Sequence, residues 1–182
     1  QMCIRDRTII ARGEDILSST PKHIMLFKSM DANLPDFCHL PLLFGPDGKK
    51  LSKRHGDTSV AAFKSKGILS EAMFNYLCLL GWSPGNDLEK FDIDTAISKF
   101  DLKNVLPNSA IFDEKKLLWL NGLYIRSTDT KDFQAKALSQ IENDIARELF
   151  DEEKSRLIKI FPSVQERICL LYTSDAADER SC

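Results

Sequence analysis

The 182-residue sequence lacks several features that define whole classes of protein. It has no apolar run near the roughly 18 residues that a membrane-spanning helix needs, and no apolar signal segment follows its first residues. Its net charge of -2 and pI near 6.0 argue against binding of nucleic acid through overall charge, so any such contact must depend on local patches. We therefore expect a cytoplasmic protein without a membrane segment.

Paired cysteines are lacking as well. The five cysteines are odd in number, widely spaced and never form a C-x-x-C pair, so neither a disulfide framework nor a zinc knuckle is indicated. Cys38 and His39 are neighbours, but adjacent residues on an extended segment point to opposite faces, and no second ligand pair is present. We expect no metal ion held by a ligand set of this chain alone.

Apolar spacing predicts an α/β segment at the start of the chain. Residues 8–11 and 39–44 are short apolar runs typical of buried strands, and between them Thr20 and Pro21 mark a helix start, with Thr20 as the cap. A strand, a helix and a strand within about 40 residues are typical of a βαβ unit in a parallel sheet. Residues 46–48, Pro-Asp-Gly, predict a turn.

After residue 57 the strand signals cease and helical patterns follow one another. Asp57 or Thr58 is expected to cap the first helix and Ser70 the second. Asp92 and Asp113 should cap two shorter helices, the second of which Gly122 should end. The predicted helical stretches, with their caps, are 57–67, 69–81, 92–101, 112–122, 130–149 and 152–161. Core packing is the expected role of three aromatic residues, although each could also stack on a base: Trp82, Phe112 and Trp119.

A concentration of positive charge lies between the two regions. Lys49, Lys50, Lys53, Arg54 and His55 fall within seven positions, directly after the predicted turn. A solvated hairpin tip is the ordinary explanation of such a run. The alternative is a mobile loop whose ammonium groups close on a polyphosphate and stabilise the charge that develops on leaving pyrophosphate. The spacing is not that of a Walker A phosphate loop.

Four ordered sequence blocks favour the second explanation. They are RGEDILSSTPKHIMLF, HLPLLFGPDGKKLSKRHGDTSV, LSEAMFNYLCLLGWS and FDEKKLLWLNGLYIR. KLSKR in the second block resembles the KMSKS signature loop of class I aminoacyl-tRNA synthetases, in the form that glutamyl-tRNA synthetases use, and the resemblance covers residues 8–168. It implies a glutamate–tRNA ligase, which activates glutamate with ATP and transfers it to the 3′ end of tRNA(Glu).

The resemblance implies roles for the loop residues. Lys53 matches the family's loop lysine that contacts the ATP phosphates, and Lys50 is expected to be a second catalytic and ATP-binding lysine. Ser52 and Arg54 would support them in binding ATP. Mg²⁺ is implied together with ATP, although no ligand for it can be named from the sequence.

The RGED block carries the other implied site residues. Arg12 matches the arginine that binds the substrate glutamate, and a guanidinium fork suits a carboxylate. Glu14 and Asp15 match an acidic pair that lines the pocket, with Glu14 expected on the amino acid and Asp15 on ATP; helix N-terminal charge or a solvated loop is the alternative for this pair. Ile16 stands where His or Trp is common in the family, so a contact between Ile16 and ATP is doubtful.

The resemblance also implies a fold class, an α/β fragment followed by mostly α structure. Residues 8–57 would be the C-terminal part of a Rossmann-like class I catalytic domain, 58–125 a helical stem-contact domain and 126–169 the start of an all-α anticodon-binding domain. Residues 1–7 and 170–182 resemble translated adapter sequence, and we expect both to be foreign to the protein.

The family's first signature, His-x-Gly-His, has no match, because none of His23, His39 and His55 has a Gly-His companion. We therefore expect a fragment that is inactive alone, whose full-length parent is a monomer that acts on glutamate, ATP and tRNA(Glu). A non-catalytic tRNA-binding module derived from such an enzyme is the alternative. A small paralogue that modifies a tRNA base is disfavoured by the helices after Asp57.

Overall fold

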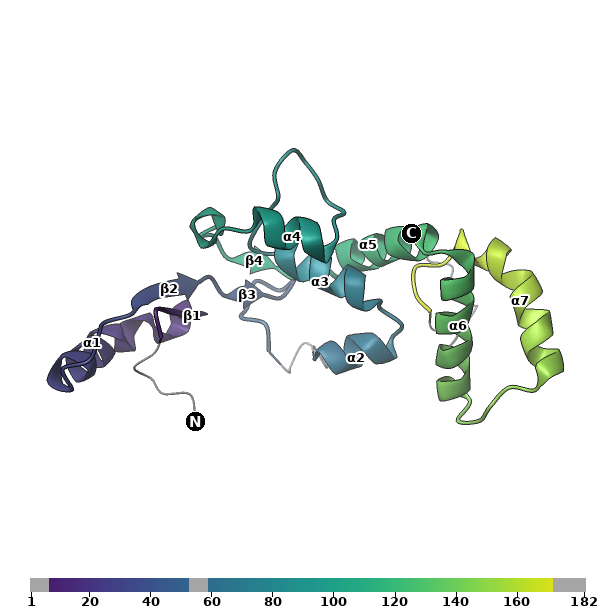
Figure 1. Cartoon of the computed structure of the whole chain (residues 1–182), viewed down its shortest axis with the longest axis horizontal. Helices are drawn as coiled ribbons and strands as arrows, with labels where there is room; N and C mark the ends of the chain where they lie inside the picture. The colour runs from purple at the N-terminus through teal and green to yellow at the C-terminus, as the bar shows by residue number, and fades with distance from the viewer. Residues whose placement is uncertain (1–6, 53–58, 172–182) are drawn as a thin grey trace.

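The computed structural model describes residues 7–52 and 59–171. These residues form an elongated molecule, with a βαβ segment at one end, α3, α4 and α5 in the middle and α6 and α7 at the other end (Figure 1). Two small sheets of two strands each occur within the described ranges. None of the helices in this part of the chain is long and apolar enough to cross a membrane.

The predicted βαβ unit is confirmed. β1 (Ile9–Gly13) and β2 (Asp36–Leu40) are parallel, and α1 (Thr20–Ser29) connects them after a 3-10 helix, η2 (Glu14–Ser19). Ala11 lies opposite Cys38 and Arg12 opposite His39 in the register. The carboxyl ends of both strands therefore meet at one edge, which in open parallel sheets is the edge where ligands bind.

The predicted second strand, 39–44, is wrong in one respect, because two strands share it. β2 ends at Leu40, and β3 (Leu43–Phe44) pairs in parallel with β4 (Ala110–Ile111), a short strand that the sequence did not predict. Pro41 lies between the two strands and has no N–H to donate to a ladder. Because β3 pairs with β4, it connects the βαβ segment to the helical region. The Phe112 N–H, next to β4, also donates to the Phe44 carbonyl at 2.8 Å.

The predicted turn at residues 46–48 is confirmed, and it closes a small hairpin. The Gly48 N–H donates to the Gly45 carbonyl at 3.0 Å, and Gly48 has a φ of +72°, which glycine adopts without steric cost. Beyond the turn, the Gly45 N–H donates to the Lys49 carbonyl and the Leu51 N–H to the Leu43 carbonyl, both at 2.8 Å. The first residues of KLSKR are therefore held by the backbone hydrogen bonds of this hairpin.

Six further helices confirm the helical pattern after residue 57. They are α2 (Val60–Ser65), α3 (Ser70–Leu79), α4 (Ile93–Lys99), α5 (Glu114–Ser127), α6 (Thr130–Asp144) and α7 (Asp151–Gln165), with a short 3-10 helix, η4 (Leu102–Asn104). The predicted cap at Ser70 is wrong: Leu69 is the N-cap, and the Ser70 hydroxyl donates to Glu71. Ser59 caps α2 by accepting from the Ala62 N–H, whereas Asp57 and Thr58 lie outside the described residues.

Three predicted helix ends are wrong. α6 ends at Asp144 and not at residue 149, because Ala146 has a positive φ that a helix cannot contain, whereas two other helices continue beyond a predicted stop. α5 continues through Gly122, which is buried, to Ser127. α7 continues through Pro162 to Gln165, whose side-chain amide donates to the Ile125 and Thr128 carbonyls at 2.8 Å each. Both extensions bind the end of α5 to α7.

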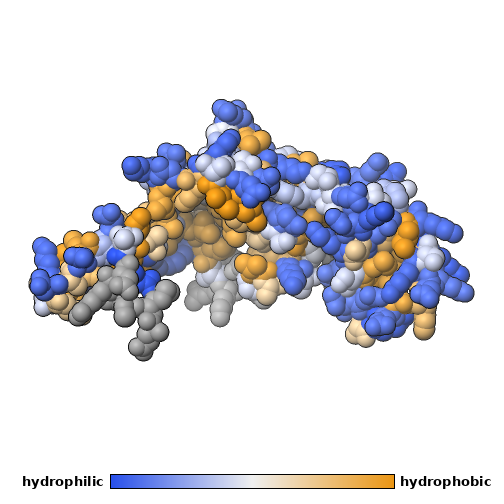
Figure 2. Space-filling view, in the orientation of Figure 1, coloured by the Kyte–Doolittle hydropathy of each residue, from blue (hydrophilic) through white to orange (hydrophobic). Residues whose placement is uncertain are grey.

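The core lies in the helical region, and α3 contributes to all three of its apolar clusters. Trp82 (3% exposed) packs on the Phe91 ring, and Phe112 packs on the rings of Phe63 and Tyr76, so core packing is confirmed for both predicted residues. The same prediction is wrong for Trp119, which is 37% exposed. Apolar surface remains on the hollowed side between the βαβ segment and the helices (Figure 2).

The end of the described chain packs on this core. Leu170 lies against one apolar cluster and Leu171 against another, and the Leu171 N–H donates to the Gly67 carbonyl at 3.3 Å. Cys38 and Cys78 are free. The foreign origin of residues 170–182 stays a prediction.

Candidate functional site

The candidate site lies at the carboxyl ends of β1 and β2. Arg12 is at the end of β1, and its guanidinium makes three hydrogen bonds with neighbouring elements. Its Nε–H donates to His39 Nε2 at 3.2 Å, one terminal nitrogen donates to His23 Nδ1 at 2.8 Å and the other to Thr20 Oγ1 at 2.7 Å. β2 and α1 thus fix the predicted glutamate-binding arginine from two sides.

The predicted capping role of Thr20 is wrong for the same reason. Thr20 lies inside α1, whose N-cap Ser19 makes no side-chain capping bond, and the Thr20 hydroxyl instead contacts Arg12 and His39 Nε2, the latter at 3.1 Å. A hydroxyl next to a helix start can satisfy either a backbone N–H or a tertiary partner. Here the Thr20 hydroxyl accepts from the charged side chain of Arg12.

An apolar cavity of about 280 Å³ adjoins this cluster. Arg12 and His23 contribute polar groups to its wall, and the ring of Phe37 lies 5.1 Å below the guanidinium carbon, within the range of a cation–π contact. The rest of the wall is formed by Ile10, Leu26, Phe27, Met30, Ala32 and Phe37. The guanidinium is therefore half-buried and shielded on one face by an aromatic ring.

The acidic pair follows Arg12 in the first turn of η2. Glu14 accepts the Leu42 N–H at 3.2 Å, and Asp15 forms an ion pair of 2.7 Å with Lys50. The hydrogen bond from Lys50 lowers the pKa of Asp15 below its ordinary value. A Cβ at Gly13 would lie 2.6 Å from an Asp15 carboxylate oxygen, so the absence of a side chain there lets this carboxylate approach the backbone.

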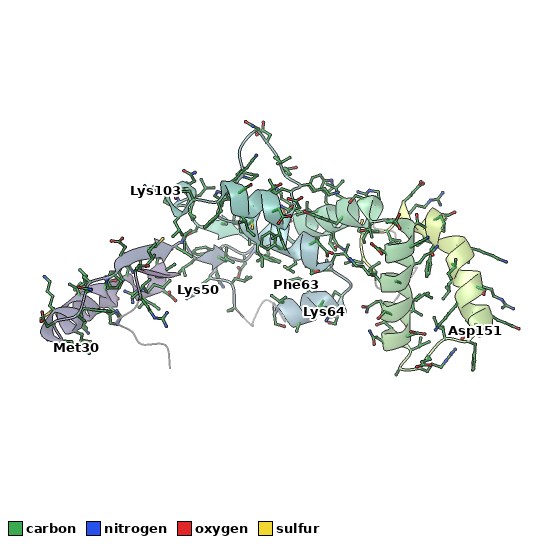
Figure 3. The ribbon with its side chains drawn as sticks, viewed as in Figure 1. Met30, Lys50, Phe63, Lys64, Lys103 and Asp151 are labelled. Atoms are coloured by element: carbon green, nitrogen blue, oxygen red, sulfur yellow. The ribbon has the colours of Figure 1, made fainter. Side chains whose placement is uncertain are left out.

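Lys50 connects this acidic pair with the hairpin that leads into the basic loop. Figure 3 shows it near the junction of the βαβ segment and the helical region. Both Lys50 and Asp15 are about half exposed, at 56% and 45% of their side chains, so the pair is accessible to solvent. The ion pair joins residues 35 positions apart, and Asp15 also lies in the first turn of η2, so the ATP role of Asp15 stays a prediction.

The structure places the predicted site residues in separate contacts. Arg12 bonds to side chains of α1 and β2, Glu14 accepts a backbone N–H, and Asp15 forms an ion pair with Lys50. Ser52 is exposed at the end of a described range, and Lys53 and Arg54 lie outside the described residues. Ile16 is 42% exposed. Over residues 7–52 and 59–171 there is no group of three or more His, Cys, Asp or Glu side chains that could hold a metal ion.

Three side chains of the site were missed by sequence reasoning: Thr20, His23 and His39. One signal was available for His39. If residues 8–11 and the run beginning at residue 39 are neighbouring parallel strands, a polar residue in the second strand can face the arginine that ends the first. The register that sets Arg12 opposite His39 is a property of the fold, and the sequence does not state it.

Comparison with known proteins agrees with this geometry. Residues 3–119 match the family model of the catalytic domain of class I tRNA synthetases (E and Q). The chain belongs to this family. Its resemblance to glutamyl-tRNA synthetases is thereby confirmed, as is the class I catalytic-domain fold.

Glutamate–tRNA ligases are among the similar proteins. The chain is 40% identical over 163 residues to that of Heliobacterium modesticaldum and 42% identical over 160 residues to that of Nitratidesulfovibrio vulgaris, in each case over 88% of this chain. It spans about a third of the length of these curated relatives, 33% and 34%.

Solved class I synthetases have the same fold. The glutamate–tRNA synthetase of Elizabethkingia anophelis superposes with a TM-score of 0.76 at 31% identity, over 90% of this chain and 36% of that one. A glutamate tRNA ligase from Elizabethkingia meningosepticum, in complex with its amino acid, superposes with a TM-score of 0.75 at 31% identity and the same coverage.

Proposed function

We propose that this chain is part of a glutamate–tRNA ligase that activates glutamate with ATP and transfers it to the 3′ end of tRNA(Glu). The observation that carries the proposal is the position of Arg12, a half-buried cation at the carboxyl edge of a parallel sheet, held by side chains of α1 and β2. A guanidinium presents donors in a geometry that matches a carboxylate.

The proposed reaction has two steps. In the first, an α-carboxylate oxygen of glutamate attacks the α-phosphorus of ATP, and the bond to pyrophosphate breaks. In the second, a ribose hydroxyl at the 3′ end of the tRNA attacks the activated carbonyl, loses its proton and displaces AMP. Arg12 binds a substrate carboxylate, and Glu14 lines the amino-acid pocket.

Lys53 is the proposed catalytic lysine of the first step. Its ammonium group would neutralise charge that develops on pyrophosphate, which stabilises the transition state more than the bound ATP. Lys50 assists it, with Ser52, Arg54 and Asp15 also at the ATP. The hydrogen-bonded hairpin base and the Asp15–Lys50 ion pair support this proposal, because they hold the start of the loop next to the carboxyl edge of the sheet.

We further propose the domain order 8–57, 58–125 and 126–169 for the end of the catalytic domain, the stem-contact domain and the start of the anticodon-binding domain. Because the sequence contains no His-x-Gly-His, we propose that this stretch alone does not complete glutamate activation. Mg²⁺ accompanies ATP in the proposed reaction, and the parent acts as a cytoplasmic monomer.

The test is aminoacylation by the full-length protein that contains this sequence. With ATP and a matched tRNA(Glu), we expect labelled glutamate to be attached and labelled aspartate not to be. Lys53→Ala should lower the rate by about a hundredfold or more, whereas Lys49→Ala, a neighbouring exposed lysine, should change it little. Failure to charge any glutamate-accepting tRNA, or full activity of Lys53→Ala, would contradict the proposal.

A further inference from the structure

Within the part of the chain that the structure describes, Arg12 has no anionic partner. Its three hydrogen bonds go to two imidazole nitrogens and one hydroxyl, and the face of the Phe37 ring completes its surroundings. Among residues 7–52 and 59–171, no Asp or Glu forms an ion pair with it. A half-buried charge without a counter-ion is costly, so this arrangement favours an anionic ligand from outside the chain.

The guanidinium keeps donors for such a ligand. It carries five N–H groups, of which the protein uses one on each nitrogen. One N–H therefore remains on each terminal nitrogen. Two donors on neighbouring nitrogens are the number that a carboxylate accepts in a bidentate pair.

The donor and acceptor roles of the side chains in this cluster can be assigned. Arginine can only donate, so His39 Nε2 and His23 Nδ1 must both accept, and both rings are neutral with their protons on the opposite nitrogens. The Thr20 hydroxyl accepts from Arg12 and lies 3.1 Å from His39 Nε2, where its proton can only share the one lone pair that also accepts the Arg12 Nε–H. Thr20 thus contacts both Arg12 and His39, which also contact each other.

We propose that Thr20 and His39 are positioning residues, which fix the orientation of the Arg12 guanidinium so that its two remaining donors meet the carboxylate of the substrate amino acid. The inference rests on the proposed role of Arg12 in binding glutamate. Neither residue contacts ATP in this scheme. Their loss should therefore weaken glutamate binding and leave ATP binding as it is.

The test compares Thr20→Val, which removes the hydroxyl at similar shape, with Thr20→Ser, which keeps it, in the full-length protein. Loss of a hydrogen bond to a charged group predicts a rise of about tenfold in the glutamate KM for Thr20→Val, with the ATP KM unchanged and with recovery in Thr20→Ser. Thr130→Val, an exposed threonine at the start of α6, is the matched control and should keep the wild-type KM.

A second pair protects the test against misfolding. His39→Gln retains a side-chain acceptor and His39→Leu does not, so the glutamate KM should rise more in His39→Leu. An unchanged glutamate KM in both Thr20→Val and His39→Leu, or equal rises in the glutamate and ATP KM values, would overturn the inference. Absence of glutamate binding by the wild-type protein in calorimetry, together with absence of charging, would instead overturn the proposed function on which the inference rests.

Discussion

The helical region and the βαβ segment use their polar side chains in opposite ways. In the helical region, buried amide and phenol side chains form hydrogen bonds with backbone atoms of distant segments. These side chains are Asn75, Tyr76, Asn121 and Gln165. In the βαβ segment, three polar side chains of α1 and β2 converge on the side chain of Arg12. The first arrangement stabilises the fold, whereas the second holds a charge in one orientation.

The two regions also differ in how many apolar side chains they bury. All three apolar clusters lie after residue 60, whereas Phe27 is the only large apolar side chain that is buried within residues 7–52. Every buried side-chain N or O atom among the described residues has a hydrogen-bond partner. Substitutions in the helical region should therefore change stability first, and substitutions around Arg12 should change ligand binding first.

The largest expected effect on stability is that of Asn121→Leu. Asn121 is fully buried, accepts the Leu69 N–H at 2.9 Å and donates to the Gly67 and Cys169 carbonyls. Its loss leaves buried backbone groups without partners, which should lower the free energy of unfolding by about 3 kcal/mol or more. Urea unfolding followed by the fluorescence of the two tryptophans, both in the helical region, measures this.

The control for that substitution is Asn108→Leu, because Asn108 is exposed. Its free energy of unfolding should stay within about 0.5 kcal/mol of the wild type. Equal effects of the two substitutions would contradict a structural role for Asn121.

Tyr76→Phe should have a smaller effect. The Tyr76 hydroxyl donates to the Asp113 carbonyl at 2.9 Å and accepts the Asp113 N–H at 2.7 Å, which fixes the start of α5. Removal of the hydroxyl should cost about 1–3 kcal/mol in the free energy of unfolding. Thermal unfolding of the variant beside Tyr76→Leu, which also loses the ring, separates the two contributions; no change in Tyr76→Phe would refute this assignment.

The same hydroxyl predicts an alkaline pH dependence. Burial raises the pKa of Tyr76 from its ordinary value of 10.0 to about 12. Because the unfolded chain loses this proton at lower pH than the folded one, the stabilisation is complete below about pH 10 and is lost as the pH rises through 12. Burial raises the pKa of Tyr124 to about 12 as well, so the ultraviolet absorbance of tyrosinate should show two late-ionising groups in the wild type, of which Tyr76→Phe removes one.

The smallest effect on stability is expected from Asp15→Asn. Its ion pair with Lys50 is half exposed, and exposed pairs contribute little. The lowered pKa of Asp15 means that the contribution is present above the usual carboxyl pKa and is lost as the pH falls through the folded value. We expect an unchanged melting temperature but a higher KM for ATP; a large loss of stability would remove the contrast between the two regions.

Local signals explain which parts of the fold were predictable. The βαβ unit was predicted because its strands and helix start have patterns within a few residues, and the Asp caps of α4 and α5, Asp92 and Asp113, were predicted for the same reason. The pairing of β3 with β4 was not, because two-residue strands about 65 residues apart leave no periodic pattern. Continuation of α7 through Pro162 likewise depends on contacts of Gln165 with a distant segment.

The candidate site was predictable in its residues and less so in its connections. Arg12, Glu14, Asp15 and Lys50 were found by resemblance, and of these the structure joins Asp15 to Lys50. Partners such as Thr20 could not be found in this way, since its hydroxyl is equally suited to a helix cap. The choice between these roles is made by the position of Arg12, which follows from the fold.

The central claim is that Arg12 is a charge held ready for the carboxylate of the substrate. Calorimetric titration of glutamate into the full-length protein tests it most directly, with Arg12→Gln and Arg12→Lys compared with the wild type. We predict that Arg12→Gln loses glutamate binding by about a hundredfold and that Arg12→Lys, which keeps the charge without the fork, recovers only part of it. Wild-type affinity for glutamate in Arg12→Gln would contradict the account.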